Sequence, residues 1–156
     1  MLAVGRMKAG PERELCERYL ERVRAIGPKV GLRRVTVQEV VESRATRSED
    51  RIADEAAALL QRIGDKDRLI CLDERGESPT SLAFAEMLEK DVAASVARMV
   101  FAIGGADGLA GEVVRRASRT ISFGRMTFPH QLVRVMLAEQ LYRAPTILSG
   151  HPYHRA

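Results

Sequence analysis

The sequence predicts an α/β fold in which a parallel sheet carries helices on both faces. Short runs rich in apolar and β-branched residues alternate with amphipathic segments of helical period along the whole chain, and this alternation is typical of parallel sheets. The chain has 156 residues, which is long enough for one domain with a core and short for two. We therefore expect a single domain over residues 1–156.

The first quarter of the chain is predicted to contain a strand, a helix and a second strand. Residues 2–5 ("LAVG") are a short strand-like start. A helix follows between Pro11 and Gly27, with acids early in the segment. Residues 32–40 ("LRRVTVQEV") return to the β-branched pattern of a strand. The apolar stripe of the helix is predicted at Leu15, Tyr19, Val23 and Ile26.

A polar loop, a second helix and a buried strand come next. Residues 41–50 ("VESRATRSED") are polar and rich in arginine and acids, which favours a flexible surface loop over RNA contact. Ser48 is a suitable cap for a helix over residues 49–63, which ends at Gly64. Residues 68–73 ("RLICLD") are almost continuously apolar, as expected for a strand buried on both faces. The stripe of the helix is predicted at Ile52, Ala56, Leu59 and Ile63.

The same alternation continues to the last helix. That helix has Pro129 at or near its first turn, and it is apolar around much of its circumference, which indicates burial on more than one side. The predicted elements are a helix at 81–90, a strand at 97–105, a helix at 109–118, a strand at 120–123 and a helix at 129–144.

The composition is that of an ordinary globular protein. Hydrophobic residues make up 46% and charged residues 29% of the chain, which excludes a mainly disordered protein. No apolar run is long enough to span a bilayer, and the first residues lack the features of a secretory signal. Cys16 and Cys71 are too few and too far apart for a disulfide framework or a thiolate metal site. We expect reduced core thiols in a cytoplasmic protein.

The charge balance is compatible with an anionic partner such as RNA. Lysine and arginine total 25 against 21 for aspartate and glutamate, which gives a net charge of +4. Many proteins without such a partner carry as much charge. Aromatic residues make up only 4% of the chain, so base stacking cannot extend over a large aromatic platform. Any nucleic-acid contact is therefore expected to be local.

Three predicted strand ends carry unusual residues. They are residues 72–77 ("LDERGE"), 103–108 ("IGGADG") and 123–128 ("FGRMTF"). In open α/β sheets, ligands bind beyond the carboxyl ends of the strands, so these three segments are the candidate site. Taken alone, the glycines at 104, 105 and 108 indicate a tight strand-to-helix turn, because the segment matches neither a Walker loop nor a first-strand dinucleotide fingerprint.

All three histidines lie in the last part of the chain. They are His130, His151 and His154, and the last two belong to the terminal segment "HPYHRA" (residues 151–156). His130 and Arg134 are one helical turn apart, which on spacing alone favours a polar stripe on an amphipathic helix over a catalytic pair. No histidine, cysteine or acid set has the spacing of a metal site, so we expect no metal.

Five segments together resemble the RlmH-type rRNA methyltransferases of the SPOUT superfamily. The two segments "FGRMTFPHQLVRVMLAEQLYRA" and "HPYHRA" are highly specific, whereas the glycine turn is not. The others are "LAVGRMK", "LDERGE" and "IGGADGL", so that the resemblance runs from one end of the chain to the other in the family's order and length.

The resemblance implies a deep trefoil-knotted α/β fold that acts as a homodimer. It implies an S-adenosylmethionine-dependent enzyme that methylates N3 of a pseudouridine in a 23S rRNA stem-loop on the assembled ribosome. It also implies a functional carboxyl-terminal tail, residues 151–156, within the single domain. The cofactor contacts carried over from the family are Leu72, Gly104, Phe123, Gly124, Arg125, Met126, Thr127 and Phe128.

The reaction also needs groups that handle a proton and bind RNA. N3 of the base must lose its proton before its lone pair is available, and His130, His154 or a water molecule can accept it. Arg134, Arg125 and Arg155 are suited to phosphates and to the imide anion, and Tyr153 to a splayed base. The predicted catalytic residues are therefore His130, Arg134 and His154, and the predicted RNA contacts are Arg125, Tyr153, His154 and Arg155.

Two other functions are open on the residues alone. One is a ribosome-associated RNA-binding module without turnover, and the other is a nucleotide-binding α/β enzyme such as a phosphate-ester hydrolase. No membrane partner is expected.

Overall fold

The computed structural model describes residues 1–155, and these form two compact units. Unit 1 consists of Met1–Met7, Val37–Ser78 and Ala97–His130. Unit 2 consists of Lys8–Thr36, Pro79–Val96 and the described part of the segment that begins at Gln131. The expectation of one domain over residues 1–156 stays a prediction.

Unit 1 contains a five-stranded sheet in which every pair of neighbouring strands is parallel. The strand order is β2-β1-β4-β3-β5. This confirms the parallel α/β sheet predicted from the alternation of periods, whereas the knot stays a prediction. The strands are β1 (Leu2–Val4), β2 (Gln38–Val40), β3 (Arg68–Glu77), β4 (Met99–Ile103) and β5 (Arg119–Ile121).

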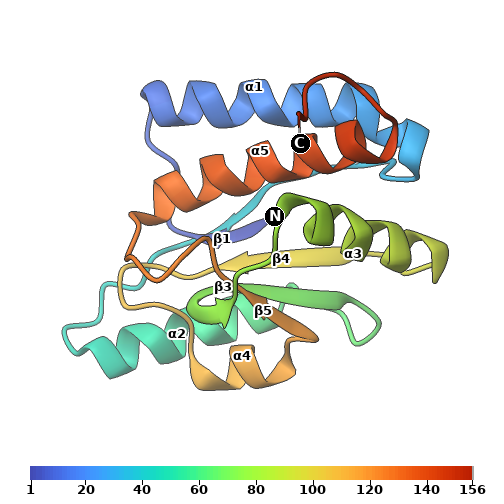
Figure 1. The fold of residues 1–156 in the computed structure, drawn as a ribbon. Helices are drawn as coiled ribbons and strands as arrows, with labels where there is room; N and C mark the ends of the chain where they lie inside the picture. Colours follow the sequence, from blue (N-terminus) through green and yellow to red (C-terminus); the bar gives the residue numbers. More distant parts are fainter. Residues whose placement is uncertain (156) are drawn as a thin grey trace. The chain divides into compact units, whose positions relative to one another are not determined.

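Two helices of unit 1 lie against the same face of this sheet. They are α2 (Ser48–Leu60) and α4 (Gly111–Arg116), which contact each other and the strands beside them (Figure 1). Burial of apolar side chains between the helices and the sheet is the main favourable term in holding such layers together. The core of this layer consists of Leu2, Val4, Val40, Ala56, Leu59, Ile63, Leu69, Cys71, Val100, Ala102 and Val113.

Strand β3 is buried on both faces, as its apolar sequence predicts. Leu69 and Cys71 belong to the core formed with α2 and α4. Ile70 and Leu72 point to the opposite face because side chains alternate along a strand, and they are buried as well. Cys71 and Cys16 are both free and buried, which confirms the prediction of core thiols.

Unit 2 is helical. It contains α1 (Pro11–Ile26), the short 3₁₀ helix Gly27–Val30, α3 (Ser81–Ala93) and α5 (His130–Leu148) from its second residue onward. Helices α1 and α5 lie side by side in Figure 1. The ring centroids of Tyr19 and Tyr142 are 6.2 Å apart, and the Cys16 thiol donates to the carbonyl oxygen of Arg134 over 3.8 Å.

Two details predicted for the helices are wrong. The buried side of α1 consists of Cys16, Leu20 and Val23, whereas Leu15 is 37% exposed. The thiol of Cys16 is as suitable for the core as an aliphatic group. Val23 is buried as predicted, whereas Cys16 and Leu20 take the buried positions predicted for Leu15 and Tyr19. Ser48 is the first residue of α2 and caps nothing; the cap position is Arg47, which makes no side-chain cap bond.

The last helix is longer than predicted. It begins at His130, directly after Pro129, and continues to Leu148 with Pro145 inside it. Pro145 has no N–H to donate to the carbonyl four residues before it, but it lies in the last turn of the helix. In the same turn the Thr146 hydroxyl donates to the carbonyl of Arg143 over 2.6 Å, and the Ser149 hydroxyl donates to that of Pro145 over 2.7 Å.

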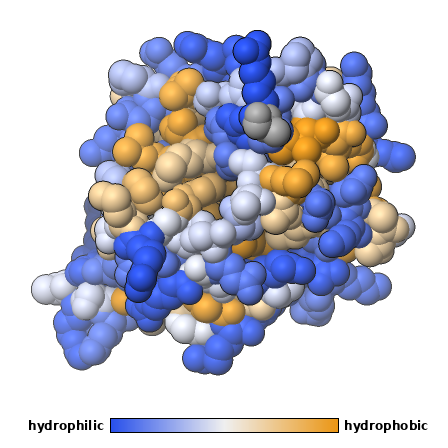
Figure 2. Space-filling view, viewed as in Figure 1, coloured by the Kyte–Doolittle hydropathy of each residue, from blue (hydrophilic) through white to orange (hydrophobic). Residues whose placement is uncertain are grey.

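The surface carries hydrophobic residues in patches among hydrophilic ones on the face drawn in Figure 2. The most exposed large hydrophobic side chains are Val41 at 86% and Met126 at 74%. Within the described residues, no helix is both long enough and apolar enough to cross a membrane.

Candidate functional site

The ends of three strands meet at one edge of the sheet in unit 1. Leu72 of β3 is in register with Ile103 of β4 on one side and with Ile121 of β5 on the other. Gly104 directly follows Ile103, and the segment 123–128 begins two residues after Ile121. Because the strands are parallel, the predicted cofactor residues after β4 and β5 lie at the same edge as Leu72.

Strand β3 does not end where the sequence suggested. The strand was predicted over residues 68–73, but β3 continues to Glu77. Both Leu72 and Glu77 pair with Ile121, with an irregularity between them, and the Ser122 N–H donates to the carbonyl of Glu77 over 2.7 Å. The register between β3 and β5 therefore shifts between Leu72 and Glu77.

The glycine turn after β4 is tight. A Cβ added to Gly104 would lie 2.6 Å from both the carbonyl carbon and the oxygen of Gly108. The Gly108 N–H donates to the carbonyl of Gly105 over 3.2 Å. Gly104 itself is not among the residues with positive φ. It is therefore required by close backbone approach and not by special backbone angles, as a strand-to-helix turn predicts.

Side-chain hydrogen bonds hold the segment 123–128 near both of its ends. The Ser122 hydroxyl accepts from the Gly124 N–H over 3.0 Å and donates to the Gly124 carbonyl over 2.7 Å. The Thr127 hydroxyl donates to the Glu74 carboxylate over 3.1 Å. Glu74 lies in the candidate segment 72–77 but was not singled out, and Ser122 was predicted only as part of a strand. Neither residue type carries a specific signal at its position.

The middle of this segment offers free space. Gly124 has a φ of 142°, and a Cβ added to it would meet nothing within 4 Å. Arg125 and Met126 are exposed, while Phe123 and Phe128 are half-buried. The backbone of Gly124 is therefore open to a neighbouring molecule.

His130 lies near the ends of β1 and β2. Its Nε2 atom is 4.0 Å from the position of a Cβ added to Gly5, and the Oε2 atom of Glu42 is 3.8 Å from the same point. Gly5 has a φ of 77°, so a glycine keeps this space free of side-chain atoms. The structure thus adds Glu42 as a candidate neighbour of the predicted proton acceptor.

Arg134 is a buried residue of α5. Its side chain is 1% exposed, since this side of α5 faces the interior. Of the three arginines predicted for phosphates and the imide anion, Arg125 and Arg155 are exposed and Arg134 is buried. The predicted role of Arg134 stays a prediction.

The tail belongs to unit 2 and is held there by Tyr153. The Tyr153 hydroxyl donates to Oε1 of Glu139 over 3.0 Å. The ring centroids of Tyr153 and Tyr142 are 4.6 Å apart, and the guanidinium carbon of Arg143 lies 4.9 Å from the Tyr153 centroid. Nη1 of Arg143 is 3.4 Å from Nδ1 of His154.

These contacts change the interpretation of Tyr153. Burial, followed by the hydrogen bonds with Tyr19 and Glu139, raises the pKa of the Tyr153 phenol, so the hydroxyl remains a donor at neutral pH. The ring already contacts Tyr142 and Arg143. Stacking on an RNA base would require the ring to exchange these contacts, whereas Arg155 is exposed.

No group of three or more histidine, cysteine, aspartate or glutamate residues able to hold a metal ion occurs within residues 1–155.

Comparison with known proteins places this arrangement in a family. The family model described as "Predicted SPOUT methyltransferase" matches residues 1–154. A protein of Rhodopseudomonas palustris (strain BisB18) named ribosomal RNA large subunit methyltransferase H is 56% identical over 156 residues, covering 100% of this chain and 98% of its own length. Proteins of the same name from Bradyrhizobium diazoefficiens and Bradyrhizobium sp. (strain ORS 278) are 53% and 51% identical over 100% of this chain and cover 98% and 96% of their own lengths.

Proposed function

Since the chain belongs to the SPOUT methyltransferase family, we propose that it transfers a methyl group from S-adenosylmethionine to N3 of a pseudouridine in a 23S rRNA stem-loop on the assembled ribosome. The family and the full-length relatives make it a methyltransferase of large-subunit ribosomal RNA. The donor, the target atom and the form of the substrate are the proposed parts. We place its action in the cytoplasm, with the ribosome as partner.

The single observation that carries the proposal is the meeting of three strand ends in register. Leu72, the turn that begins at Gly104 and the segment 123–128 lie at one edge of the sheet. Together they would hold S-adenosylmethionine, with Gly124 leaving room beside the backbone. When bound, this cofactor supplies a methyl carbon that its sulfonium sulfur has already activated, so the chain mainly has to orient the target nitrogen toward it.

The remaining chemistry is the removal of the N3 proton. His130 is the favoured acceptor, because its Nε2 lies 4.0 Å from the position of a Cβ added to Gly5, in the same unit as the proposed cofactor segments. His154 is the alternative acceptor, and in this structure its Nδ1 lies near Arg143. Arg125 and Arg155, both exposed, are proposed to contact RNA phosphates.

The fold is proposed to be a single SPOUT domain with a deep trefoil knot, and the active form a homodimer. In such an isologous dimer each tail can serve the partner's site. The tail, residues 151–156, is proposed to complete the RNA site. Its last residue lies outside the described residues.

Transfer of a labelled methyl group tests the function directly. Ribosomes from cells that lack the enzyme are incubated with the protein and labelled S-adenosylmethionine, and the modified nucleotide is identified after digestion of the rRNA. Label at N3 of a pseudouridine in 23S rRNA is expected. Cofactor binding by calorimetry without any transfer would instead support a non-catalytic RNA-binding module, and absence of cofactor binding would support another nucleotide-binding enzyme.

Mixing two inactive variants tests where the tail acts. One chain lacks residues 151–156, and the other carries Gly104→Val. If the tail serves the partner's site, the mixed dimer contains one site with both defects and one with neither, so activity returns. If the tail serves its own site, every site keeps one defect and the mixture stays inactive. A tail-deleted protein with full activity would remove the tail from the mechanism.

A further inference from the structure

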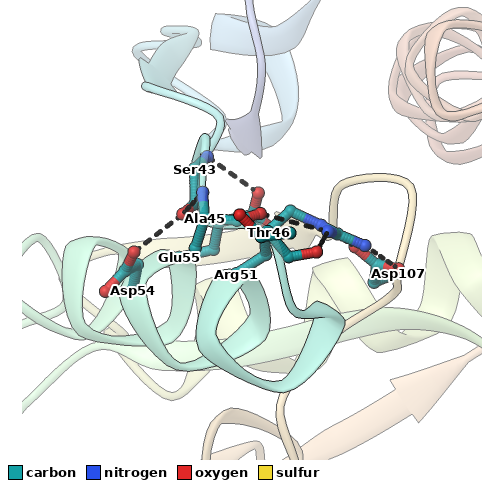
Figure 3. A network of polar contacts seen from close by, with 7 residues as sticks. All are labelled: Ser43, Ala45, Thr46, Arg51, Asp54, Glu55 and Asp107. Carbon is teal, nitrogen blue, oxygen red and sulfur yellow. Dashed lines mark hydrogen bonds and ion pairs between the residues drawn. The ribbon is translucent and has the colours of Figure 1, made fainter.

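One guanidinium joins three segments of unit 1. The Arg51 side chain donates from Nε and Nη2 to the two carboxylate oxygens of Asp107, over 2.7 and 3.0 Å (Figure 3). Its Nη1 donates to the carbonyls of Ala45 and Thr46 over 3.1 and 2.9 Å. Arg51 is on α2, Asp107 is in the turn after β4, and residues 45 and 46 are in the loop after β2. The loop that the sequence suggested to be flexible is therefore fastened.

The Arg51–Asp107 ion pair is less exposed than a typical surface pair and is held by two hydrogen bonds. The Arg51 and Asp107 side chains are 29% and 26% exposed, whereas those of Arg47 and Glu49, near the start of the same helix, are 71% and 79% exposed. A two-pronged arginine–carboxylate pair fixes both position and orientation, which an exposed single contact does not. The hydrogen bond from Arg51 lowers the pKa of the Asp107 carboxyl, so the pair stays charged at neutral pH.

The buried side chain of Glu55 lies next to the same turn, at Gly105. Its side chain is 5% exposed, and its Oε1 atom accepts from the Ser43 N–H over 3.1 Å. Its Oε2 atom is buried without a hydrogen-bond partner and lies 2.9 Å from the position of a Cβ added to Gly105. Burying an unpartnered carboxylate oxygen is costly, and a fold that keeps one next to the Gly104–Gly105 backbone needs a reason.

We propose that Arg51 and Glu55 are positioning residues for the cofactor turn. Arg51 fixes the position of the turn through its ion pair with Asp107. Glu55 limits how closely the backbone of Gly105 can approach α2. Together they would hold the backbone at Gly104 in the conformation that receives the cofactor. The proposal rests on the proposed function, because it assigns these residues to the binding of S-adenosylmethionine. It also couples the loop after β2 to the turn, since both are held by one guanidinium.

The proposal has a physical requirement that can be measured without cofactor. Gly108 closes the turn by donating its N–H to the carbonyl of Gly105 over 3.2 Å. If Arg51 and Asp107 hold the turn closed, weakening their pair opens this hydrogen bond more often. Amide hydrogen exchange at Gly108 reports such local opening.

The test compares three variants with a matched control. Arg51→Lys keeps the charge but loses the planar fork, Asp107→Asn keeps the shape but loses the charge, and Glu55→Ala removes the carboxylate that lies beside Gly105. The control is Glu49→Gln, which breaks the exposed pair on the same helix. In the cofactor-free protein, exchange at Gly108 is expected to rise in the three variants and not in the control. Calorimetry is expected to give about tenfold weaker binding of S-adenosylmethionine in the three variants.

A combined variant and a stability measurement separate positioning from general damage. Arg51→Lys with Asp107→Asn is expected to bind hardly more weakly than either single variant, because the two residues act through one contact. Urea unfolding shows which variants are folded at the temperature of the assays, and Asp107→Asn carries the test if Arg51→Lys does not fold.

Two results overturn the proposal, and they differ from failure of the proposed function. Folded variants with wild-type exchange at Gly108 would show that the pair does not hold the turn. Faster exchange with wild-type cofactor affinity would show that the turn's closure is irrelevant to binding. A wild-type protein that binds no S-adenosylmethionine would instead defeat the proposed function together with this inference.

Discussion

Replacing Gly104 by alanine adds one methyl group to a turn that has no room for it. The new Cβ would lie 2.6 Å from the carbonyl carbon and oxygen of Gly108 and 3.0 Å from the amide nitrogen of Leu109. All three are backbone atoms, which cannot swing aside as a flexible side chain can. The turn must widen by several tenths of an ångström, and overpacking of this kind costs about 1–3 kcal/mol.

The widening should also remove the cofactor site, because Gly104 belongs to the turn proposed to bind it. Urea unfolding is expected to show the loss of stability, and calorimetric titration with S-adenosylmethionine is expected to show no binding in the folded variant. Gly108→Ala is the control for stability: it introduces strain at a φ of 84° but meets nothing within 4 Å. Wild-type stability and affinity in Gly104→Ala would refute both the crowding and the assignment of Gly104.

Three further predictions concern side chains in both units. Tyr153→Phe removes the hydroxyl that donates to Glu139, so urea unfolding should show a loss of about 1 kcal/mol, and a carboxypeptidase should remove the tail faster. Burial raises the pKa of Glu55 in the folded protein. The contribution of Glu55 to the free energy of unfolding is therefore present below its unfolded pKa and is lost as pH rises through its folded pKa. Glu55→Gln should remove this loss from the pH profile of urea unfolding. The hydrogen bond from Arg98 lowers the pKa of Asp67, so that pair stabilises above the unfolded pKa and its contribution is lost as pH falls through the folded one. Arg98→Met should remove this acid-side loss, about 0.5–1 kcal/mol after solvent screening, and an unchanged profile would contradict it.

The layers of unit 1 could be predicted from the sequence because periodicity reports burial. Residues 68–73 are apolar at almost every position, and β3 is buried on both faces there. The edge strand was predicted less well: residues 32–40 have β-branched residues, but only Gln38–Val40 pair with β1. An edge strand has one neighbour, so its length depends on that partner more than on its own composition.

The candidate site could be predicted in part, for a topological reason. Parallel strands place their carboxyl ends at one edge, so unusual residues after β3, β4 and β5 had to come close together. The contacts that hold this edge could not be predicted. Arg51 and Asp107 are 56 positions apart, and each has the residue type expected of a solvated surface. Glu55 is next to Ala56 of the predicted apolar stripe, and a charged residue there carries no sign of being buried.

The glycines at this edge differ in what surrounds them. Substitutions at some of them should distort the turn, whereas a side chain introduced at Gly124 should contact only a bound molecule. Gly104 and Gly105 are crowded by other protein atoms within 3 Å, so substitutions there act by distorting the turn. Gly124 has open space around the position of its Cβ, so a side chain at this position would collide only with something that binds.

Gly124→Ala is therefore the most direct probe of cofactor contact. Its φ of 142° is strained for alanine, which should cost about 1 kcal/mol of stability. Gly150→Ala is the matched control, because Gly150 has a φ of 68°, has open space as well and lies in unit 2. Urea unfolding is expected to give similar losses for the two variants, whereas calorimetry is expected to show weaker S-adenosylmethionine binding in Gly124→Ala alone. Equal affinities for both variants and the wild type would place the cofactor away from the segment 123–128, and the open space beside Gly124 would then have no part in the reaction.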